Sequence, residues 1–353
     1  MPDIDVTLAL AGLFIGAVVG LTGMGGGALM TPVLVLFFGI PPLAAVSSDL
    51  VVSLIMKPVG GAVHLRRGTV NKPLVGWLVL GSVPSAFAGV LLLKALGDGE
   101  RVQEVIKLAL GVALLLASAT IVVKAYLQMR SYAQARQLAL AGGTVPRPAP
   151  MVVRPVPTML IGVLGGFVVG MTSVGSGSLI IVLLLLLYPT IKSSDVVGTD
   201  LVQAVPLVGA AALGHLLFGD VRLDLTASLL VGALPGVYLG ARVSSRAPQG
   251  LIRRVLVLVL VASGLKLLGL GDVQLGLLLV AGVVGGPLLW TAARRREGLP
   301  KRWRLALRAP DGRRRLFWEA LAVGVHNSPE ERPTADRGNG VQPVSSVAEP
   351  PQG

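Results

Sequence analysis

Two long stretches without a charged side chain are the strongest constraint on how this chain can fold. Residues 6–48 and 155–191 contain no Asp, Glu, Lys, Arg or His, and each stretch exceeds the roughly 20 apolar residues that cross a bilayer. The chain as a whole is 53% hydrophobic and 14% charged, with a mean hydropathy of +0.77. This composition is too apolar for an ordinary soluble domain. We therefore predict an all-α polytopic membrane protein.

Charge and cysteine content exclude several other classes of protein. Asp3 and Asp5 occupy the N-terminus, where a cleavable signal peptide would carry Lys or Arg, so we expect the first segment to be retained. The chain has no Cys and only three His. We therefore expect no disulfide, no metal site and no other cofactor. Its net charge of +13 comes largely from Arg in loops and after Ala293. This pattern is typical of contact with anionic lipid headgroups and not of nucleic-acid binding.

Nine apolar segments are separated by charged residues or by Pro and Gly. We expect them at residues 6–40, 43–65, 73–96, 107–123, 157–188, 197–218, 225–241, 255–270 and 273–293. The first and the fifth are too long for one ordinary helix, and a glycine cluster interrupts each, at residues 23–27 and 175–177. Their arms are short for a bilayer at about 1.5 Å per residue. We therefore predict two re-entrant helical hairpins with glycine at their tips.

The two halves of the chain are related in sequence. The run GAVVGLTGMGGGAL from Gly16 matches GFVVGMTSVGSGSL from Gly166 at an offset of 150 residues. Beyond a one-residue insertion the offset is 151, which aligns Asp49 with Asp200. We therefore divide the chain into transmembrane repeat 1 (1–127), a basic cytoplasmic linker (128–155), transmembrane repeat 2 (156–270), an additional transmembrane helix (271–293) and a basic, largely disordered cytoplasmic tail (294–353).

The distribution of Lys and Arg predicts how the segments are oriented. Basic residues gather at 66–72, 130–154 and 242–254 and in the tail, and we place all four regions in the cytoplasm. Each repeat then consists of one re-entrant hairpin and three transmembrane helices. Because three is an odd number, the second repeat is inverted relative to the first. We expect the tail to be an interfacial anchor followed by disorder, with a regulatory segment as the alternative.

The glycine tips are candidate parts of an anion-binding site. Irregular backbone at membrane depth exposes amide groups that a ligand or a neighbouring helix must satisfy. A half-helix that begins after Gly27 or Gly177 directs N–H groups and the positive end of its dipole toward the middle of the membrane. Tight packing through small residues is the alternative interpretation. The candidate substrate-binding residues at the tips are Thr22, Gly25, Gly26, Gly27, Thr172, Ser173, Gly175, Ser176 and Gly177.

Two more candidates for substrate binding lie in the segments that follow the hairpins. Lys57 has no counterpart in repeat 2, where Val208 occupies the equivalent position. It could neutralise an anion, or it could pair with Asp49, which lies eight residues earlier and about 80° around a helix. Gln203 could hydrogen-bond a substrate, although packing against a neighbouring helix is the favoured role.

Another set of polar residues suggests structural or proton-coupling roles. Asp49 and Asp200 are costly inside apolar segments unless they have partners, and each follows a hydroxyl residue, Ser48 or Thr199. A carboxylate would repel an anion. We therefore favour capping of a helix or fastening of the adjacent hairpin over a proton relay or direct contact with substrate.

Histidine also recurs at equivalent positions of the two repeats, as His64 and His215. An imidazole can couple protons near neutral pH, but an interfacial position is the favoured interpretation. An intramembrane hydrolase would need a nucleophile such as Ser176 beside His215. Nothing in the local sequence SVGSGS singles out one serine, so we expect no enzymatic activity.

The paired motifs resemble the TauE/SafE sulfite-exporter family, also called the TSUP transporters. The first half carries GLTGMGGGALMTPVL, SSDL and HLRRGTVN, and the second half carries GMTSVGSGSL, GTDLV and GHLLFGDV. The resemblance covers residues 8–270, and the additional helix and the tail lie beyond it. It implies a multi-pass transporter of the bacterial cytoplasmic membrane for sulfite, organosulfonates, thiosulfate or related small anions.

On this basis we predict a secondary transporter with export as the expected direction. The substrate would bind between the two tips, and access would alternate as one repeat moves against the other. The expected partners are a small anionic substrate and the lipid bilayer, without nucleic acid. A non-transporting membrane scaffold or assembly protein is the alternative.

Overall fold

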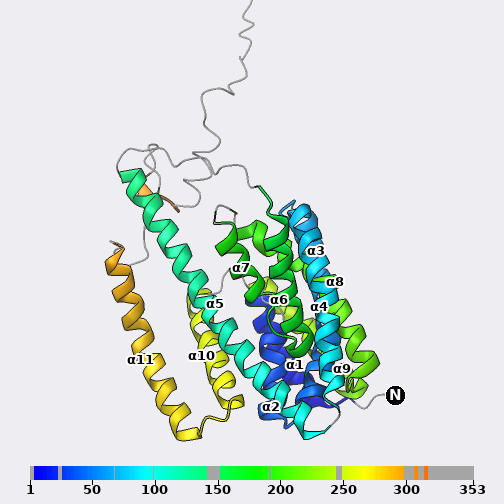
Figure 1. The fold of residues 1–353 in the computed structure, drawn as a ribbon. Helices are drawn as coiled ribbons and strands as arrows, with labels where there is room; N and C mark the ends of the chain where they lie inside the picture. Colours follow the sequence, from blue (N-terminus) through cyan, green and yellow to red (C-terminus); the bar gives the residue numbers. More distant parts are fainter. Residues whose placement is uncertain are drawn as a thin grey trace, which may run out of the picture. The chain divides into compact units, whose positions relative to one another are not determined.

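The computed structural model describes residues 4–22, 26–66, 68–97, 99–140, 152–189, 191, 193–243, 249–297, 306–308 and 314–316. The chain divides into two units, residues 1–298 and 299–353. The regular structure described in the first unit is helical (Figure 1) and comprises α1 (Val6–Thr22), α2 (Gly27–Phe37), α3 (Pro42–Arg66), α4 (Lys72–Ala95), α5 (Glu100–Leu140), α6 (Pro155–Thr172), α7 (Leu179–Leu187), α8 (Ser193–Phe218), α9 (Leu223–Val243), α10 (Gln249–Leu267) and α11 (Asp272–Arg296).

The second unit contains two short strands that the sequence analysis did not predict. β1 (Ala306–Arg308) pairs antiparallel with β2 (Arg314–Leu316). The sequence between them includes Pro-Asp-Gly, a combination typical of tight turns. The all-α prediction is confirmed by the described helices of the first unit, and the two short strands lie in the tail, outside the predicted transmembrane segments. The predicted anchor and disorder of the remaining tail lie outside the described residues.

Each predicted apolar segment corresponds to a helix or to a pair of helices. The first segment is divided into α1 and α2, and the fifth into α6 and α7. The largest difference is α5, which continues to Leu140 and so includes the first part of the predicted linker. Residues 124–140 are rich in Ala, Leu, Gln and Arg and contain neither Gly nor Pro. These helix-favouring residues extend the helix beyond its apolar part.

Helix lengths identify a multi-pass membrane protein. Six described helices, α4, α5, α6, α8, α9 and α11, are long and apolar enough to cross a membrane. In contrast, α2 and α7 have 11 and 9 residues, which at about 1.5 Å per residue cannot span one. α6, with 18 residues, is longer than the short arm predicted for a re-entrant hairpin. The predicted short arms are therefore found as α2 and α7, the second helix of each broken pair.

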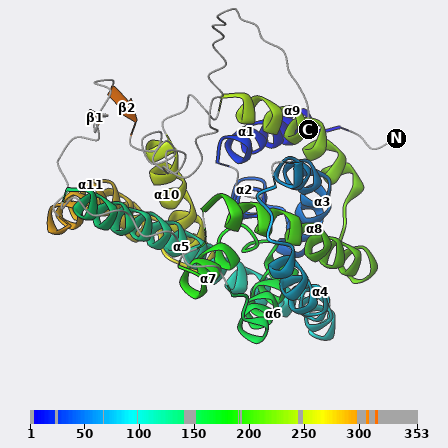
Figure 2. The same cartoon turned by 90° about the horizontal axis from the view of Figure 1, so that it is seen from above.

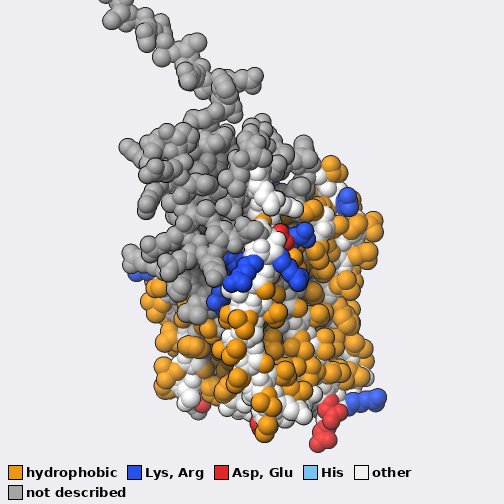
Figure 3. All heavy atoms as spheres, turned by 90° about the vertical axis from the view of Figure 1, so that its left-hand side faces the viewer, with side chains coloured by type: hydrophobic (Ala, Val, Ile, Leu, Met, Phe, Trp, Pro, Cys, Tyr) orange, Lys and Arg blue, Asp and Glu red, His pale blue; other side chains and the backbone are white. Residues whose placement is uncertain are grey.

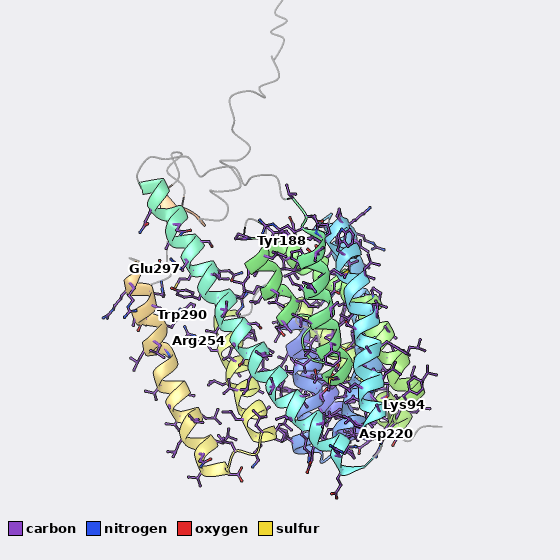
Figure 4. The ribbon with its side chains drawn as sticks, in the orientation of Figure 1. Lys94, Tyr188, Asp220, Arg254, Trp290 and Glu297 are labelled. Carbon is purple, nitrogen blue, oxygen red and sulfur yellow. The ribbon has the colours of Figure 1, made fainter. Side chains whose placement is uncertain are left out.

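The surface has the charge distribution of a membrane protein. On the face drawn in Figure 3, hydrophobic side chains form a broad zone, with Lys and Arg gathered along its upper edge. Figure 4 shows Lys94 and Asp220 toward one end of the helices, and Tyr188 and Glu297 toward the other. Charged and amphipathic side chains at the ends of apolar helices match the interfaces of a bilayer.

The two halves of the chain pack together reciprocally. α1 packs along α9, and α6, the counterpart of α1, packs along α4, the counterpart of α9. Glycine allows these helices to approach closely. A Cβ atom at Gly232 would lie 1.7 Å from the carbonyl oxygen of Ala9, and one at Gly162 would lie 2.4 Å from that of Leu78. Any larger residue would push the paired helices apart, so the two repeats are interlocked.

The two short helices occupy the space between these outer pairs. In the view from above, the α1/α9 pair and the α4/α6 pair lie on opposite sides of α3 and α8 (Figure 2). α2 packs against α3 and α10, while α7 packs against α8 and α5. α11 packs against α10 and has no buried residue. The ends of the broken helices are thereby enclosed by α3, α8, α5 and α10.

Candidate functional site

The tips of the two broken helices meet directly. A Cβ atom at Gly27, the first residue of α2, would lie 2.1 Å from the carbonyl oxygen of Ser173, which follows α6. Ser173 has a left-handed backbone conformation with φ 60° and ψ −4°, and its amide donates to the Val169 carbonyl at 2.8 Å. Gly175 has φ 126°, a value that side chains disfavour. These two residues turn the chain between α6 and α7 and place Ser173 against α2.

A pocket lies beside the paired tips, with an empty volume of about 340 Å³ that includes its open mouth. One side is formed by the first turn of α2, the residues between α6 and α7, and Lys57 of α3. The other side is formed by apolar residues of α5 and α10. The lining residues are Gly27, Ala28, Lys57, Ala117, Ile121, Ser173, Gly175, Ser176, Gly177, Ser178 and Leu260.

Lys57 supplies a positive charge to this pocket. Its side chain is 6% exposed, and its Nζ donates a hydrogen bond to Ser176 Oγ at 2.8 Å. Asp49 and Asp200 act on the ammonium group electrostatically, but no ion pair joins Lys57 to either carboxylate among the described residues. Of the two roles left open by the sequence, the structure therefore places Lys57 at the pocket and not in a pair with Asp49.

Backbone amides add to the positive character of the pocket. The first turn of α2 lies at the pocket wall, where a helix carries the positive end of its dipole. In the second tip the Gly175 carbonyl accepts from the amides of Ser178, Leu179 and Ile180. The amides of Ser176 and Gly177 have no backbone acceptor within the described part of the chain. Such N–H groups, together with an ammonium group, are suited to binding an anion.

The two buried aspartates are held outside the pocket by different partners. Asp49, which is fully buried, accepts hydrogen bonds from Thr31 Oγ1 at 2.8 Å and from Ser53 Oγ at 3.5 Å. Asp200 accepts from Gln203 Nε2 at 3.0 Å, and Gln203 Oε1 accepts from Ser82 Oγ at 3.4 Å. Asp49 thus ties α2 to α3, while Asp200 belongs to a network between α8 and α4.

The hydroxyl residues that precede the aspartates have different environments. Ser48 is fully buried and its Oγ has no hydrogen-bond partner among the described residues. Thr199 Oγ1 accepts from the backbone amide of Asn71 at 3.0 Å. Asn71 also caps α4 by accepting from the Leu74 amide at 3.1 Å. Thr199 therefore fastens the start of α4 to α8.

His215 is buried in the core, so the interfacial position favoured from the sequence is wrong for this residue. It is 0% exposed, with Nε2 2.8 Å from the Gly170 carbonyl oxygen and Nδ1 2.7 Å from Ser47 Oγ. The break in α6 explains this position. The Val174 amide, which would bond Gly170 in a continuous helix, donates instead to Thr172 Oγ1 at 3.2 Å. The Gly170 carbonyl then needs another donor.

His64 differs from its counterpart. It is partly buried, and its Nδ1 lies 2.9 Å from Thr69 Oγ1 near the end of α3. The interfacial position of His64 stays a prediction. A hydrolytic pair of Ser176 and His215 is not formed, because Ser176 contacts Lys57 and both His215 ring nitrogens have other partners.

The structure brings together most of the predicted tip residues. Gly27, Lys57, Ser173, Gly175, Ser176 and Gly177 line the pocket. Gly26 faces the Asp49 carboxylate instead, Thr172 Oγ1 donates to the Val168 carbonyl at 2.6 Å, and Gln203 holds Asp200, so none of these three lines the pocket. Gly25 and the Thr22 side chain lie outside the described residues.

Several residues of the site were missed from the sequence. Ala117, Ile121 and Leu260 supply its apolar wall, and Thr31 binds Asp49. The first three are ordinary apolar residues of transmembrane helices and carry no recognisable signal. Thr31 could have been noticed, because it is a lone hydroxyl residue inside an apolar segment and hydroxyls there often bond to other helices.

Polytopic helical architecture, together with two broken helices that meet at a basic pocket, defines the class of a membrane transporter. The chain belongs to the sulfite exporter TauE/SafE family, whose model matches residues 8–267. This confirms the resemblance seen in the sequence motifs. The match ends at the last residue of α10, so α11 and the tail lie beyond it.

Similar proteins are membrane transporters by name. Probable membrane transporter protein YjnA of Bacillus subtilis (strain 168) is 40% identical over 265 residues, 75% of this chain and 100% of that protein. Probable membrane transporter protein YdhB of the same organism is 24% identical over 262 residues, 74% of this chain and 99% of that protein. No solved structure matches the chain.

Proposed function

We propose that the protein is a secondary transporter of small sulfur-containing anions in the bacterial cytoplasmic membrane, with export as its direction. The observation that carries this proposal is the Lys57 ammonium group at 2.8 Å from Ser176, in a pocket formed by the two tips. None of the described residues that line this pocket carries a carboxylate. The Lys57 charge and the amides of Ser176 and Gly177, which lack a backbone acceptor among the described residues, therefore favour a negatively charged ligand.

The two walls of the pocket suit the two parts of an organosulfonate. The oxygen atoms of a sulfite, thiosulfate or sulfonate group can accept from the Lys57 ammonium group and the Ser176 hydroxyl. An attached carbon chain would contact Ala117, Ile121 and Leu260 on the apolar side. Inorganic sulfite would use only the polar wall, so we expect organosulfonates to gain affinity from apolar contact.

Alternating access requires groups of helices that move as rigid bodies relative to one another. In Figure 1 the chain enters α1 from the lower side and α6 from the upper side, which supports the inverted arrangement of the repeats. However, the glycine contacts between α1 and α9 and between α4 and α6 join helices of different repeats. We therefore propose that each moving body combines helices from both repeats, in place of one repeat moving against the other.

Flux measurements in proteoliposomes test the transport function. Reconstituted protein should move labelled sulfite, an organosulfonate or thiosulfate down an imposed anion gradient, and Lys57→Met should lose most of this flux. Melting of each sample shows whether the variant is folded. If the folded wild-type protein moves none of the three anions, the transport proposal is wrong and the scaffold function is favoured.

A further inference from the structure

A second group of polar atoms lies next to the anion pocket and surrounds the Asp49 carboxylate. Thr31 of α2 and Ser53 of α3 direct hydroxyl groups to its two oxygens, at 2.8 and 3.5 Å. Ser173, between α6 and α7, is a third hydroxyl residue whose side chain acts on Asp49. Three separate parts of the chain therefore deliver hydroxyl oxygens to one buried carboxylate.

The Ser173 hydroxyl is the unusual member of this group. It is 5% exposed, and its Oγ makes no hydrogen bond with any described residue. A buried polar atom without a partner is costly and is uncommon in folded proteins. The Ser173 hydroxyl interacts with the Asp49 carboxylate, but the two groups do not reach the distance and angle of a full hydrogen bond. A cation bound between their oxygens would satisfy both groups.

We propose that Asp49, Thr31, Ser53 and Ser173 bind a monovalent alkali cation, Na⁺. One carboxylate supplies the single negative charge that such an ion requires, and the hydroxyls supply neutral oxygen ligands. Divalent cations usually take more carboxylates, and the described residues contain no cluster of three His, Cys, Asp or Glu.

Repeat 2 shows why this site is expected at only one of the two aspartates. Asp200 accepts from the Nε2 amide of Gln203 at 3.0 Å, and an N–H donor cannot ligate a cation. The positions equivalent to Thr31 and Ser53 are Ile181 and Ala204, which offer no oxygen. The shared aspartate therefore has hydroxyl ligands in repeat 1 alone.

The cation site and the anion pocket share Ser173. This residue lines the pocket, while Lys57 acts on Asp49 across the same region. A cation at Asp49 would cancel one of the two buried negative charges that act on Lys57 and would reduce its repulsion of an anion. Each ion would then raise the affinity of the other by the same factor. This coupling rests on the proposed transport function, whereas the cation site itself does not.

Melting of the full-length protein in the absence of any sulfur anion tests the cation site. Equal concentrations of sodium and choline chloride are compared at constant pH, and Na⁺ should raise the Tm with saturation. Asp49→Asn should remove this shift, and Thr31→Val should increase the half-saturating Na⁺ concentration by about tenfold or more. The matched variant Asp200→Asn should keep the shift. Thr31→Val and Ser173→Ala decide the matter if Asp49→Asn does not fold.

Two results would overturn the cation site. One is an equal Tm in sodium and choline. The other is a Tm that responds to pH alone, which would identify a proton at Asp49. Anion-dependent melting is then measured with and without Na⁺ to test the coupling, and Na⁺ should lower the half-saturating sulfite concentration. A Na⁺ shift in a protein that transports no anion would retain the cation site and reject the transport function.

Discussion

The contact between the two tips can be tested by adding a single methyl group at Gly27. A Cβ atom there would lie 2.1 Å from the Ser173 carbonyl oxygen and 2.9 Å from its carbonyl carbon. Non-bonded atoms prefer about 3.5 Å, so Gly27→Ala must separate the tips by about 1 Å. Backbone atoms lie on both sides of this contact, and no side-chain rotation can relieve it.

The expected cost follows from this enforced separation. Overpacking of a well-packed core costs about 1–3 kcal/mol. If the anion requires the closed arrangement of the tips, the same free energy weakens its binding roughly 5- to 150-fold. Gly27→Ala should therefore lower both the Tm of the protein and its affinity for sulfite or an organosulfonate.

Gly61→Ala in α3 is a matched control for this experiment. It adds the same methyl group beside another backbone carbonyl, but the nearest atom, the Leu201 oxygen, lies 3.7 Å away. Anion affinity is measured by ligand-dependent melting, and flux is measured in proteoliposomes. If Gly27→Ala and Gly61→Ala behave alike in both assays, the tips do not form the site and the reasoning fails.

Three other predictions follow from individual contacts. Lys57→Met should weaken anion binding by about tenfold or more, because a hydrogen bond to a charged group contributes about 1.5–3 kcal/mol, whereas Lys57→Arg should retain part of it; unchanged binding by the Met variant would contradict this role. His215→Phe should destabilise the protein by about 1–3 kcal/mol through the unpaired Gly170 carbonyl, and the partly buried His64→Phe should cost less; equal melting of the two variants would reject the difference. Truncation after Leu270 should leave melting and flux nearly unchanged, because α11 has no buried residue; loss of either would show that α11 supports the core.

Much of the architecture could be predicted from the sequence because it is encoded in local patterns. The charge-free stretches contain more residues than a helix needs to span a bilayer, so they predicted membrane helices. Glycine clusters marked the positions where two of these helices are broken. Motif residues that recur at a nearly constant offset along the chain, such as Asp49 and Asp200, revealed the repeat. The paired motifs were enough to identify the TauE/SafE family, which the match over residues 8–267 confirms.

Helix ends were harder to predict where hydrophobicity and helix propensity disagree. α5 extends to Leu140 because helix-favouring residues continue after hydrophobicity falls. The position of His215 was also misjudged from its place near the end of a segment. Its burial depends on the freed Gly170 carbonyl of α6, a residue 45 positions away along the chain.

The partners within the site were decided only by the tertiary structure. From helix geometry alone, Lys57 was equally suited to Asp49 and to an anion, and its contact with Ser176 joins residues 119 positions apart. The apolar pocket wall likewise comes from α5 and α10, which lie on the far side of the tips. Sequence determined the class of the protein, the broken helices and the family, because these depend on short-range patterns of charge, glycine and hydrophobicity. Tertiary structure decided which residues of the two tips are in contact and which helices complete the pocket, since these contacts depend on how distant helices pack.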